Sequence, residues 1–272
     1  MDIEADLHIH TTASDGELGP EEVLQLAAAT NLKAVAITDH DSVEAVKASA
    51  AAGARRHVLV VPGVEISCDY MDEEVHLLGY YINPADKGLT SVLERLRESR
   101  YCRMRKMVEE AVSSGIEIGE AEKQSLLKNP APGRLHLAKL LVKKGFATSI
   151  KEAFFKYLDK GKPFYVERFK LTPAEIIQMI MNAGGVPVLA HPGLLKDKKI
   201  IDATIAAGVK GIEVYYPLHS PGLIKDLLDL AALNKLIPTG GSDFHGPNIR
   251  QDKIGSAGVS LGVLKDLLKI RR

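Results

Sequence analysis

The 272-residue sequence predicts an α/β barrel with an inserted helical segment, and three features of the chain support this prediction. Short apolar runs alternate with helical patterns in both halves of the chain, as they do in consecutive βα units. Polar side chains follow the ends of most of these runs, as at the mouth of a barrel. Between the two halves, residues 87–170 are dominated by helical patterns.

The rival α/β architecture is an open, doubly wound sheet, and the distribution of polar residues distinguishes the two. In an open sheet, functional residues gather mainly beside the point where the strand order reverses. In this chain they follow the first, second, third, fifth and last predicted strands. Loops from around a ring would bring all of them to one place, so the barrel is favoured.

The first predicted strand contains His8 and His10. Alternate side chains of a strand share a face, so both imidazoles point the same way and can hold one ion, whereas Leu7 and Ile9 point into the core. The loop that follows brings Asp15 back toward the two histidines. A histidine pair alone is equally compatible with a structural role, and the motifs further along the chain decide the matter.

The other elements expected in the first half are a helix over 20–30, a strand over 34–40, a helix over 43–56, and strands over 58–67 and 74–81. Pro20 lies near the start of the first helix, where its fixed φ suits the first turn. The run over 34–40 is apolar on both faces, as in a buried parallel strand, and ends at His40. The next two strands contain Glu65 and His76.

Residues 87–170 form the predicted insertion, or cap, so the barrel is predicted from residues 1–86 and 171–272. Helices are expected over 91–114, 134–145 and 150–158, with a connector at 115–119 and one strand-like run at 163–166. The second half of the barrel then contains helices over 173–183, 200–207, 223–234 and 262–270, and strands that begin at residues 186, 211 and 237. His191, Asp243 and His245 lie at the ends of these strands.

The composition predicts a cytoplasmic protein that does not enter a membrane. The chain has 35 basic and 35 acidic residues, so its total charge does not indicate a nucleic-acid coat or a membrane-surface protein. We find no signal-peptide pattern, no apolar run of ~20 residues and no indication of an obligate protein partner. Cys68 and Cys102 are predicted to be buried free thiols, because two cysteines are too few for a disulfide scaffold.

The strand-end residues together form a set of six imidazoles and three carboxylates. They are His8, His10, Asp15, His40, Glu65, His76, His191, Asp243 and His245. Imidazole binds Zn, Fe or Mn, and carboxylates can bridge ions, so the set suits two or three divalent metal ions. Ions roughly 3.5–4 Å apart can share a hydroxide and clamp phosphate oxygens, which predicts hydrolysis of a phosphate ester.

The same motifs resemble those of the PHP (polymerase and histidinol phosphatase) family of metal-dependent phosphoesterases. They are His8-Ile-His10, Thr38-Asp-His-Asp41, Gly63-Val-Glu65, the His76 strand, His191-Pro-Gly193 and Gly241-Ser-Asp-Phe-His245. The resemblance extends along the chain apart from the helical insertion. It implies a distorted (β/α)7 barrel, in which a metal-activated hydroxide attacks the phosphorus atom.

The resemblance also implies a trinuclear centre. Its first ion would be held by His8, His10, Glu65 and Asp243; its second by Glu65, His76 and His191; and its third by Asp15, His40 and His245. Some relatives have a histidine at the position of Asp15. By this pattern, Glu65, His191 and Asp243 would hold the attacking hydroxide.

The insertion should select the substrate. Gly133-Arg-Leu-His136 resembles a segment of the PHP subgroup that acts on nucleotides and RNA ends, which implies that Arg134 and His136 bind substrate. An arginine at a helix N-terminus suits phosphate, although an ordinary exposed arginine is the structural alternative. His219, after the sixth strand, is predicted to contact substrate at the barrel mouth, the alternative being an ordinary loop histidine. The implied substrate is a 3′,5′-nucleotide bisphosphate or a short 5′-phosphorylated oligonucleotide shortened from its 5′ end.

Two other functions share these motifs. Histidinol-phosphate phosphatase would require an acidic group near the site, which Gly133-Arg-Leu-His136 argues against, and a non-catalytic PHP accessory domain would not require the full ligand set. Among the remaining polar residues, Asp39 is predicted to orient an imidazole and Asp41 to cap the next helix. Glu213, Tyr215 and Tyr216 are predicted to fill or rim the barrel.

Overall fold

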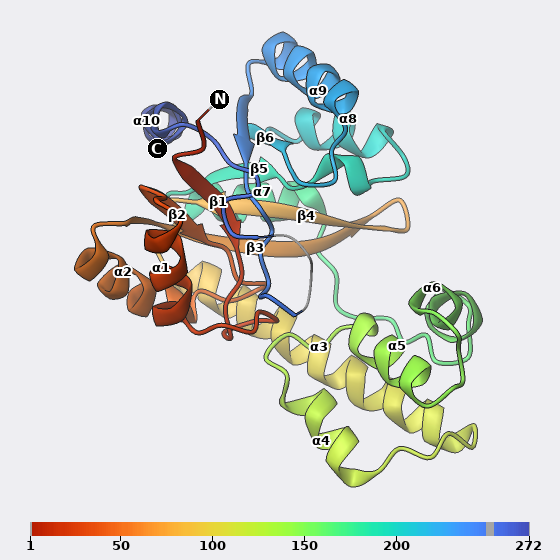
Figure 1. Ribbon diagram of the computed structural model, residues 1–272. Helices are drawn as coiled ribbons and strands as arrows, with labels where there is room; N and C mark the ends of the chain where they lie inside the picture. Colours follow the sequence, from red (N-terminus) through yellow and green to blue (C-terminus); the bar gives the residue numbers. More distant parts are fainter. Residues whose placement is uncertain (1, 249–252, 272) are drawn as a thin grey trace. The chain divides into compact units, whose positions relative to one another are not determined.

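The computed structural model describes residues 2–248 and 253–271 (Figure 1). It divides into two compact units: a barrel unit, Met1–Leu93 with Lys170–Arg272, and a helical unit, Glu94–Phe169. The boundary falls within one helix, α3 (Lys87–Ser113), whose first turns belong to the barrel unit.

The barrel unit contains a seven-stranded sheet in the order β1 to β7. The strands are β1 (Ala5–Ile9), β2 (Ala34–Ile37), β3 (Leu59–Tyr70), β4 (Glu73–Tyr80), β5 (Val186–Leu189), β6 (Gly211–Tyr215) and β7 (Ile237–Gly240). A parallel bridge between Ile9 and Phe244 brings the segment after β7 alongside β1, so the sheet is a nearly closed barrel. The predicted barrel is therefore confirmed.

One strand departs from a regular (β/α)7 pattern. β4 runs antiparallel to both β3 and β5, whereas all other neighbouring strands are parallel. A tight turn at Met71 and Asp72, both with positive φ, joins β3 to β4 in place of a helix. The hairpin lets two neighbouring strands both contribute side chains to the same end of the barrel.

Helices surround the barrel (Figure 1). They are α1 (Pro20–Ala29), α2 (Glu44–Arg56), α7 (Pro173–Asn182), α8 (Lys199–Ala206), α9 (Pro221–Asn234) and α10 (Leu261–Ile270). Both faces of β2 are apolar because both are buried. Ala34 and Ala36 pack inside the barrel, and Val35 and Ile37 pack against the helical layer. All four side chains are fully buried, as predicted.

Asp6 joins the first strand to the segment after the last. Its carboxylate accepts hydrogen bonds from the Ser242 N–H at 2.9 Å, the Ser242 hydroxyl at 2.6 Å and the Gly255 N–H at 2.8 Å. Burial raises the pKa of Asp6 to about 6, although these bonds oppose the rise. Because Asp6 and Ser242 are 236 positions apart in the sequence, the barrel closes only through the tertiary fold.

The helical unit contains most of α3, α4 (Glu120–Lys128), α5 (Arg134–Lys143), α6 (Ile150–Ala153) and the π-helical turn η1 (Phe154–Leu158). The sequence analysis did not identify α4. Residues 163–166 do not form the expected strand, because Phe164 packs into the helical core. There its ring stacks on the ring of Tyr157, with 5.1 Å between the two centroids. Within the described residues, no helix is long and apolar enough to span a membrane.

The two cysteines differ in exposure. Cys68 is buried in β3, as predicted, but Cys102 is exposed on α3, so that prediction was wrong. The inward face of α3 includes Met104, Met107 and Val108, and Cys102 lies outside this stripe.

Candidate metal centre

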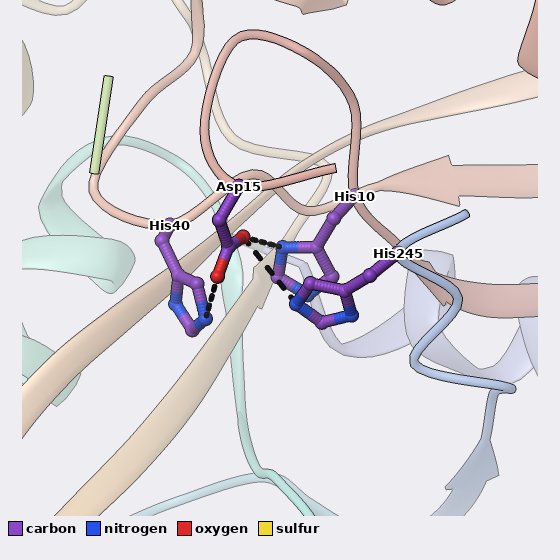
Figure 2. A group of neighbouring side chains, drawn as sticks. All are labelled: His10, Asp15, His40 and His245. Atoms are coloured by element: carbon purple, nitrogen blue, oxygen red, sulfur yellow. Dashed lines mark ion pairs between the residues drawn. The ribbon is translucent and has the colours of Figure 1, made fainter. Parts of the chain in front are cut away.

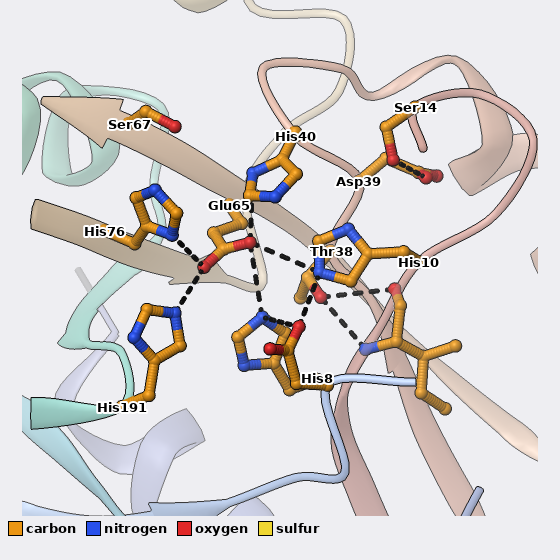
Figure 3. A network of polar contacts seen from close by, with 12 residues as sticks. His8, His10, Ser14, Thr38, Asp39, His40, Glu65, Ser67, His76 and His191 are labelled. Atoms are coloured by element: carbon orange, nitrogen blue, oxygen red, sulfur yellow. Dashed lines mark hydrogen bonds and ion pairs between the residues drawn. The ribbon is translucent and has the colours of Figure 1, made fainter. Parts of the chain in front are cut away.

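All nine predicted ligands come together at the end of the barrel where the parallel strands terminate. His8 lies in β1, Glu65 in β3 and His76 in β4, while the other six lie in loops that directly follow strands or, for Asp15, in the loop before α1. Figure 3 shows most of these side chains pointing toward Glu65. Residues far apart in the sequence therefore share one buried site.

Glu65 lies at the centre of this site and is fully buried. Its Oε2 atom lies 3.1–3.3 Å from ring nitrogens of His8, His10 and His40. Its Oε1 atom lies 2.9 Å from His76 Nδ1 and 3.1 Å from His191 Nε2 (Figure 3). Burial alone would raise the pKa of Glu65, but the surrounding histidines hold it well below its ordinary value.

Three groups of ligand atoms within this site are compact enough to surround an ion. They are His8, His10, Glu65 and Asp243; His40, Glu65 and His76; and His10, Asp15, His40 and His245. The first has the same members as the first predicted set. The second contains His40 where His191 was predicted, although His191 approaches the same oxygen of Glu65 as His76 does.

The third group adds His10 to the predicted trio (Figure 2). Asp15 Oδ1 lies 3.5 Å from His10 Nδ1 and 3.3 Å from His245 Nε2, and its Oδ2 lies 3.8 Å from His40 Nε2. The other ring nitrogens of His10 and His40 face Glu65. His10 and His40 therefore each belong to two of the three groups, because one ring nitrogen faces Asp15 and the other faces Glu65.

The polar atoms of this site fit divalent cations. Several are buried without a hydrogen-bond partner: His8 Nε2, both ring nitrogens of His10, Asp15 Oδ1, His40 Nδ1, Glu65 Oε2 and His76 Nδ1. Burying polar atoms without hydrogen bonds is costly, and these atoms converge on one another, so the arrangement fits divalent cations between them. Imidazole with carboxylate is a donor set suited to Mn, Fe or Zn.

The carboxylates also change the protonation of the histidines. Burial lowers the pKa of His10, but Asp243 and Glu65 outweigh that effect and raise it to about 9. Burial likewise opposes protonation of His76, whose pKa the Glu65 and Glu74 carboxylates raise to about 10. In contrast, burial lowers the pKa of His40 to about 3. Without cations, protons would therefore occupy part of the site.

Glu213, on β6, supports two of the predicted ligands. It is fully buried; its Oε1 lies 3.0 Å from His8 Nδ1, and its Oε2 accepts the His191 N–H at 2.7 Å. When Nδ1 of His8 carries the proton, the lone pair of Nε2 points toward Glu65 and Asp243, where it can bind a metal ion. The sequence analysis predicted that Glu213 fills or rims the barrel, although an acid within an otherwise apolar, buried strand was a signal of this supporting function.

Tyr216 supports a third ligand. Its hydroxyl donates a hydrogen bond to Asp243 Oδ2 at 3.0 Å, so Oδ1 is left to face His8 and His10. Both Asp243 and His191 have positive φ, at 53° and 26°. A residue with a side chain rarely adopts this conformation, which costs about 1–3 kcal/mol and is commonest where function requires it.

Asp39 and Asp41 have roles other than those predicted. Asp39 does not orient an imidazole: it accepts hydrogen bonds from Thr11 N–H at 2.7 Å and from the hydroxyls of Thr11 and Ser14 at 2.8 and 2.6 Å. It thereby fixes the loop that ends at Asp15. The N-cap of α2 is Val43, while Asp41 accepts the Ser67 N–H of β3. The sequence placed both acids beside the site but could not identify their partners.

His219 is buried beside the turn that follows β5. Its Nδ1 lies 2.9 Å from the Val214 carbonyl and its Nε2 accepts the Gly193 N–H at 3.1 Å, so both ring nitrogens are bonded to the main chain. Burial lowers its pKa. A Cβ at position 193 would lie 2.6 Å from the ring, which explains the glycine. Contact of His219 with substrate remains a prediction.

Arg134 and His136 lie in the first turn of α5, in the helical unit. His136 Nδ1 accepts the Gly133 N–H at 3.1 Å, and its Nε2 lies 3.0 Å from Asn129 Nδ2. The Arg134 guanidinium lies over the Phe154 ring, 5.5 Å from its centroid. Substrate binding by this pair also remains a prediction.

Comparison with known proteins finds similarity over nearly the whole chain. The sequence profile of the PHP domain matches residues 6–167. The chain is 36% identical to a 3′,5′-nucleoside bisphosphate phosphatase of Chromobacterium violaceum, covering 98% of this chain and 93% of that protein. It is 34% identical to the 5′-3′ exoribonuclease Rnm of Salmonella typhimurium, covering 89% and 85%.

Solved structures show the same similarity. A Chromobacterium violaceum protein described as an amidohydrolase, with bound sulfate and no metal, superposes with a TM-score of 0.84 at 33% identity, covering 98% of each chain. A protein from Bifidobacterium adolescentis assigned as a metal-dependent phosphoesterase gives a TM-score of 0.84 at 29% identity, covering 97% and 95%.

Proposed function

Since this chain belongs to the PHP domain family, we propose that it hydrolyses phosphate esters at the 5′ end of nucleotides. Two substrate forms share this chemistry: a 3′,5′-nucleoside bisphosphate, and a 5′-phosphorylated oligoribonucleotide shortened from its 5′ end. The relatives at 36% and 34% identity bear the names of these two activities. The observation that carries the proposal is the convergence of the nine predicted ligands at one end of the barrel, where six of them have buried polar atoms without a hydrogen bond.

The site residues would hold two or three divalent ions. His8, His10, Glu65 and Asp243 would hold one, Glu65, His76 and His191 a second, and Asp15, His40 and His245 a third, with Mn, Fe or Zn as suitable metals. When bound, such ions acidify a water molecule and neutralise charge that develops on phosphoryl oxygens.

The protein's own contribution is to fix the ligands before substrate arrives. Glu213 sets which ring nitrogen of His8 faces the site, and the Tyr216 hydroxyl turns Asp243 so that one oxygen faces inward. Glu65, His191 and Asp243 are proposed to hold the attacking solvent molecule. Such preorganisation lowers the cost of reorientation during reaction.

Substrate recognition is proposed for Arg134, His136 and His219. Arg134 stands in the first turn of α5, where a guanidinium and backbone N–H groups suit a phosphate. His219 would act mainly through the turn over residues 192–194, since its ring nitrogens are already bonded.

The decisive experiment compares three substrates on the metal-loaded protein: a 3′,5′-bisphosphate nucleoside, a 5′-phosphorylated oligoribonucleotide and histidinol phosphate. Efficient turnover of either nucleotide substrate supports the proposal. Faster turnover of histidinol phosphate would overturn it, and binding of well under one ion per chain would favour a non-catalytic role. Arg134→Ala should raise KM for the nucleotide while metal content stays constant; unchanged kinetics would remove Arg134 from recognition.

A further inference from the structure

The zero net charge of the chain conceals two oppositely charged units. The helical unit, Glu94–Phe169, contains 17 Lys and Arg against 10 Asp and Glu, a formal charge of +7. The remaining residues contain 18 basic against 25 acidic residues, a formal charge of −7. A basic unit attracts polyanions, and a single bisphosphate nucleoside carries fewer negative charges than the positive excess of this unit.

Phe155 is an unusual side chain in this unit because 67% of its surface is exposed. It lies in η1, between Phe154, which packs against the helical core, and residues that lead to the buried Phe164. A π-helical turn is rare and occurs often at functional sites. The turn packs Phe154, which is half-buried, against the helical core and leaves Phe155 exposed to solvent.

A cation accompanies the exposed ring. The Lys162 ammonium lies 4.9 Å from the centroid of Phe155, and the Arg134 guanidinium lies over the neighbouring Phe154. An aromatic ring beside a cation is the arrangement with which proteins hold single-stranded nucleic acid: a base stacks on the ring, and the cation attracts the phosphate.

We propose that Phe155 and Lys162 form a subsite for single-stranded RNA on the helical unit. A base stacks on the exposed part of the Phe155 ring, while Lys162 contacts a backbone phosphate. The proposal rests on the proposed function, since it concerns the longer of the two substrates. It predicts that the helical unit favours an oligoribonucleotide over a single nucleotide.

The first test measures binding without cleavage. A fluorescently labelled, 5′-phosphorylated oligoribonucleotide is titrated with the metal-free full-length protein, and anisotropy is recorded at several salt concentrations. Phe155→Ala should weaken binding about tenfold, as expected for one stacked base, and Phe155→Trp should retain it. Lys162→Ala should lower the slope of log K against log salt by about 0.7, the value for one phosphate contact with a single strand.

Phe146→Ala is the matched control, because Phe146 is also an exposed phenylalanine of the helical unit, at 38% exposure, and lies outside the proposed subsite. It should bind the oligonucleotide as the parent protein does. Equal affinity of the parent protein and Phe155→Ala, or equal loss in the Phe146 variant, would overturn the proposal.

The second test uses the metal-loaded protein and separates this subsite from the proposed function. Phe155→Ala should raise KM for the oligoribonucleotide about tenfold and leave both kinetic constants for the 3′,5′-bisphosphate nucleoside unchanged. An equal effect on both substrates would overturn the subsite while leaving the proposed function intact. Absence of turnover with either substrate would refute the proposed function, but the binding test would still decide the subsite.

Discussion

Glu213→Gln should weaken metal binding without removing any ligand. Gln has the shape of Glu, and the His191 N–H must still find an acceptor, so the amide oxygen should stay at the 2.7 Å contact now made by Oε2. The amide NH2 group then faces His8 Nδ1, where the carboxylate now lies at 3.0 Å. A donor there favours the tautomer with its proton on Nε2, the atom that faces Glu65 and Asp243.

The size of the effect follows from burial. Loss of such an outer hydrogen bond typically costs about 10–100-fold in metal affinity, or roughly 1.4–2.8 kcal/mol. Glu213 is fully buried and supports two ligands, so its variant should fall in the upper part of that range. Glu74 provides a graded control: it lies 3.6 Å from His76 Nε2 and is 32% exposed, so Glu74→Gln should change affinity by only a few-fold.

The assay is a titration of the metal-free protein with Mn²⁺ or Zn²⁺ in competition with a chromophoric chelator. Thermal unfolding of the metal-free variants shows whether the fold itself has changed. Equal affinities for the parent protein and Glu213→Gln, or a larger loss in Glu74→Gln, would refute the argument that Glu213 sets the tautomer of His8.

Three further outcomes are expected. Glu65→Gln should abolish activity and lower the metal content by at least one ion per chain, as measured by elemental analysis, and a variant with full metal content would contradict the central position of Glu65. Asp39→Ala leaves three donors of the Thr11–Ser14 loop without their acceptor, so the ion beside Asp15 should be lost first; loss of every ion at once would contradict this order. The pKa values of about 9 for His10 and about 10 for His76 keep both imidazoles protonated near pH 7 in the metal-free protein, so metal binding should release protons and become stronger as the pH rises. Calorimetry in buffers of different ionisation enthalpy measures this proton release. A titration that shows no proton release would contradict the prediction.

The sequence predicted which side chains converge at the barrel end more completely than it predicted which residues support them. His8 and His10 were assigned to one face because alternation along a strand is a local property, and the strand-end positions of His40 and His191 followed from the βα pattern. In contrast, the bond between His8 and Glu213 joins residues 205 positions apart across the barrel. No local pattern shows which strands face each other at that depth.

Other differences have the same origin. Asp39 was placed beside the site, but its partners depend on how the Thr11–Ser14 loop folds back, which the sequence does not determine. The expected strand at residues 163–166 has an extended-strand composition, but packing of Phe164 into the helical core decided its conformation. The opposite charges of the two units cancel in the total charge, which was the only charge that the sequence analysis considered.

The closure of the barrel through Asp6 and Ser242 has a consequence for biosynthesis. His8 and His10 are synthesised before Asp243 and His245, so a growing chain holds an incomplete set of predicted ligands until residue 245 has been made. The nine side chains can meet at one end of the barrel only after translation has passed residue 245.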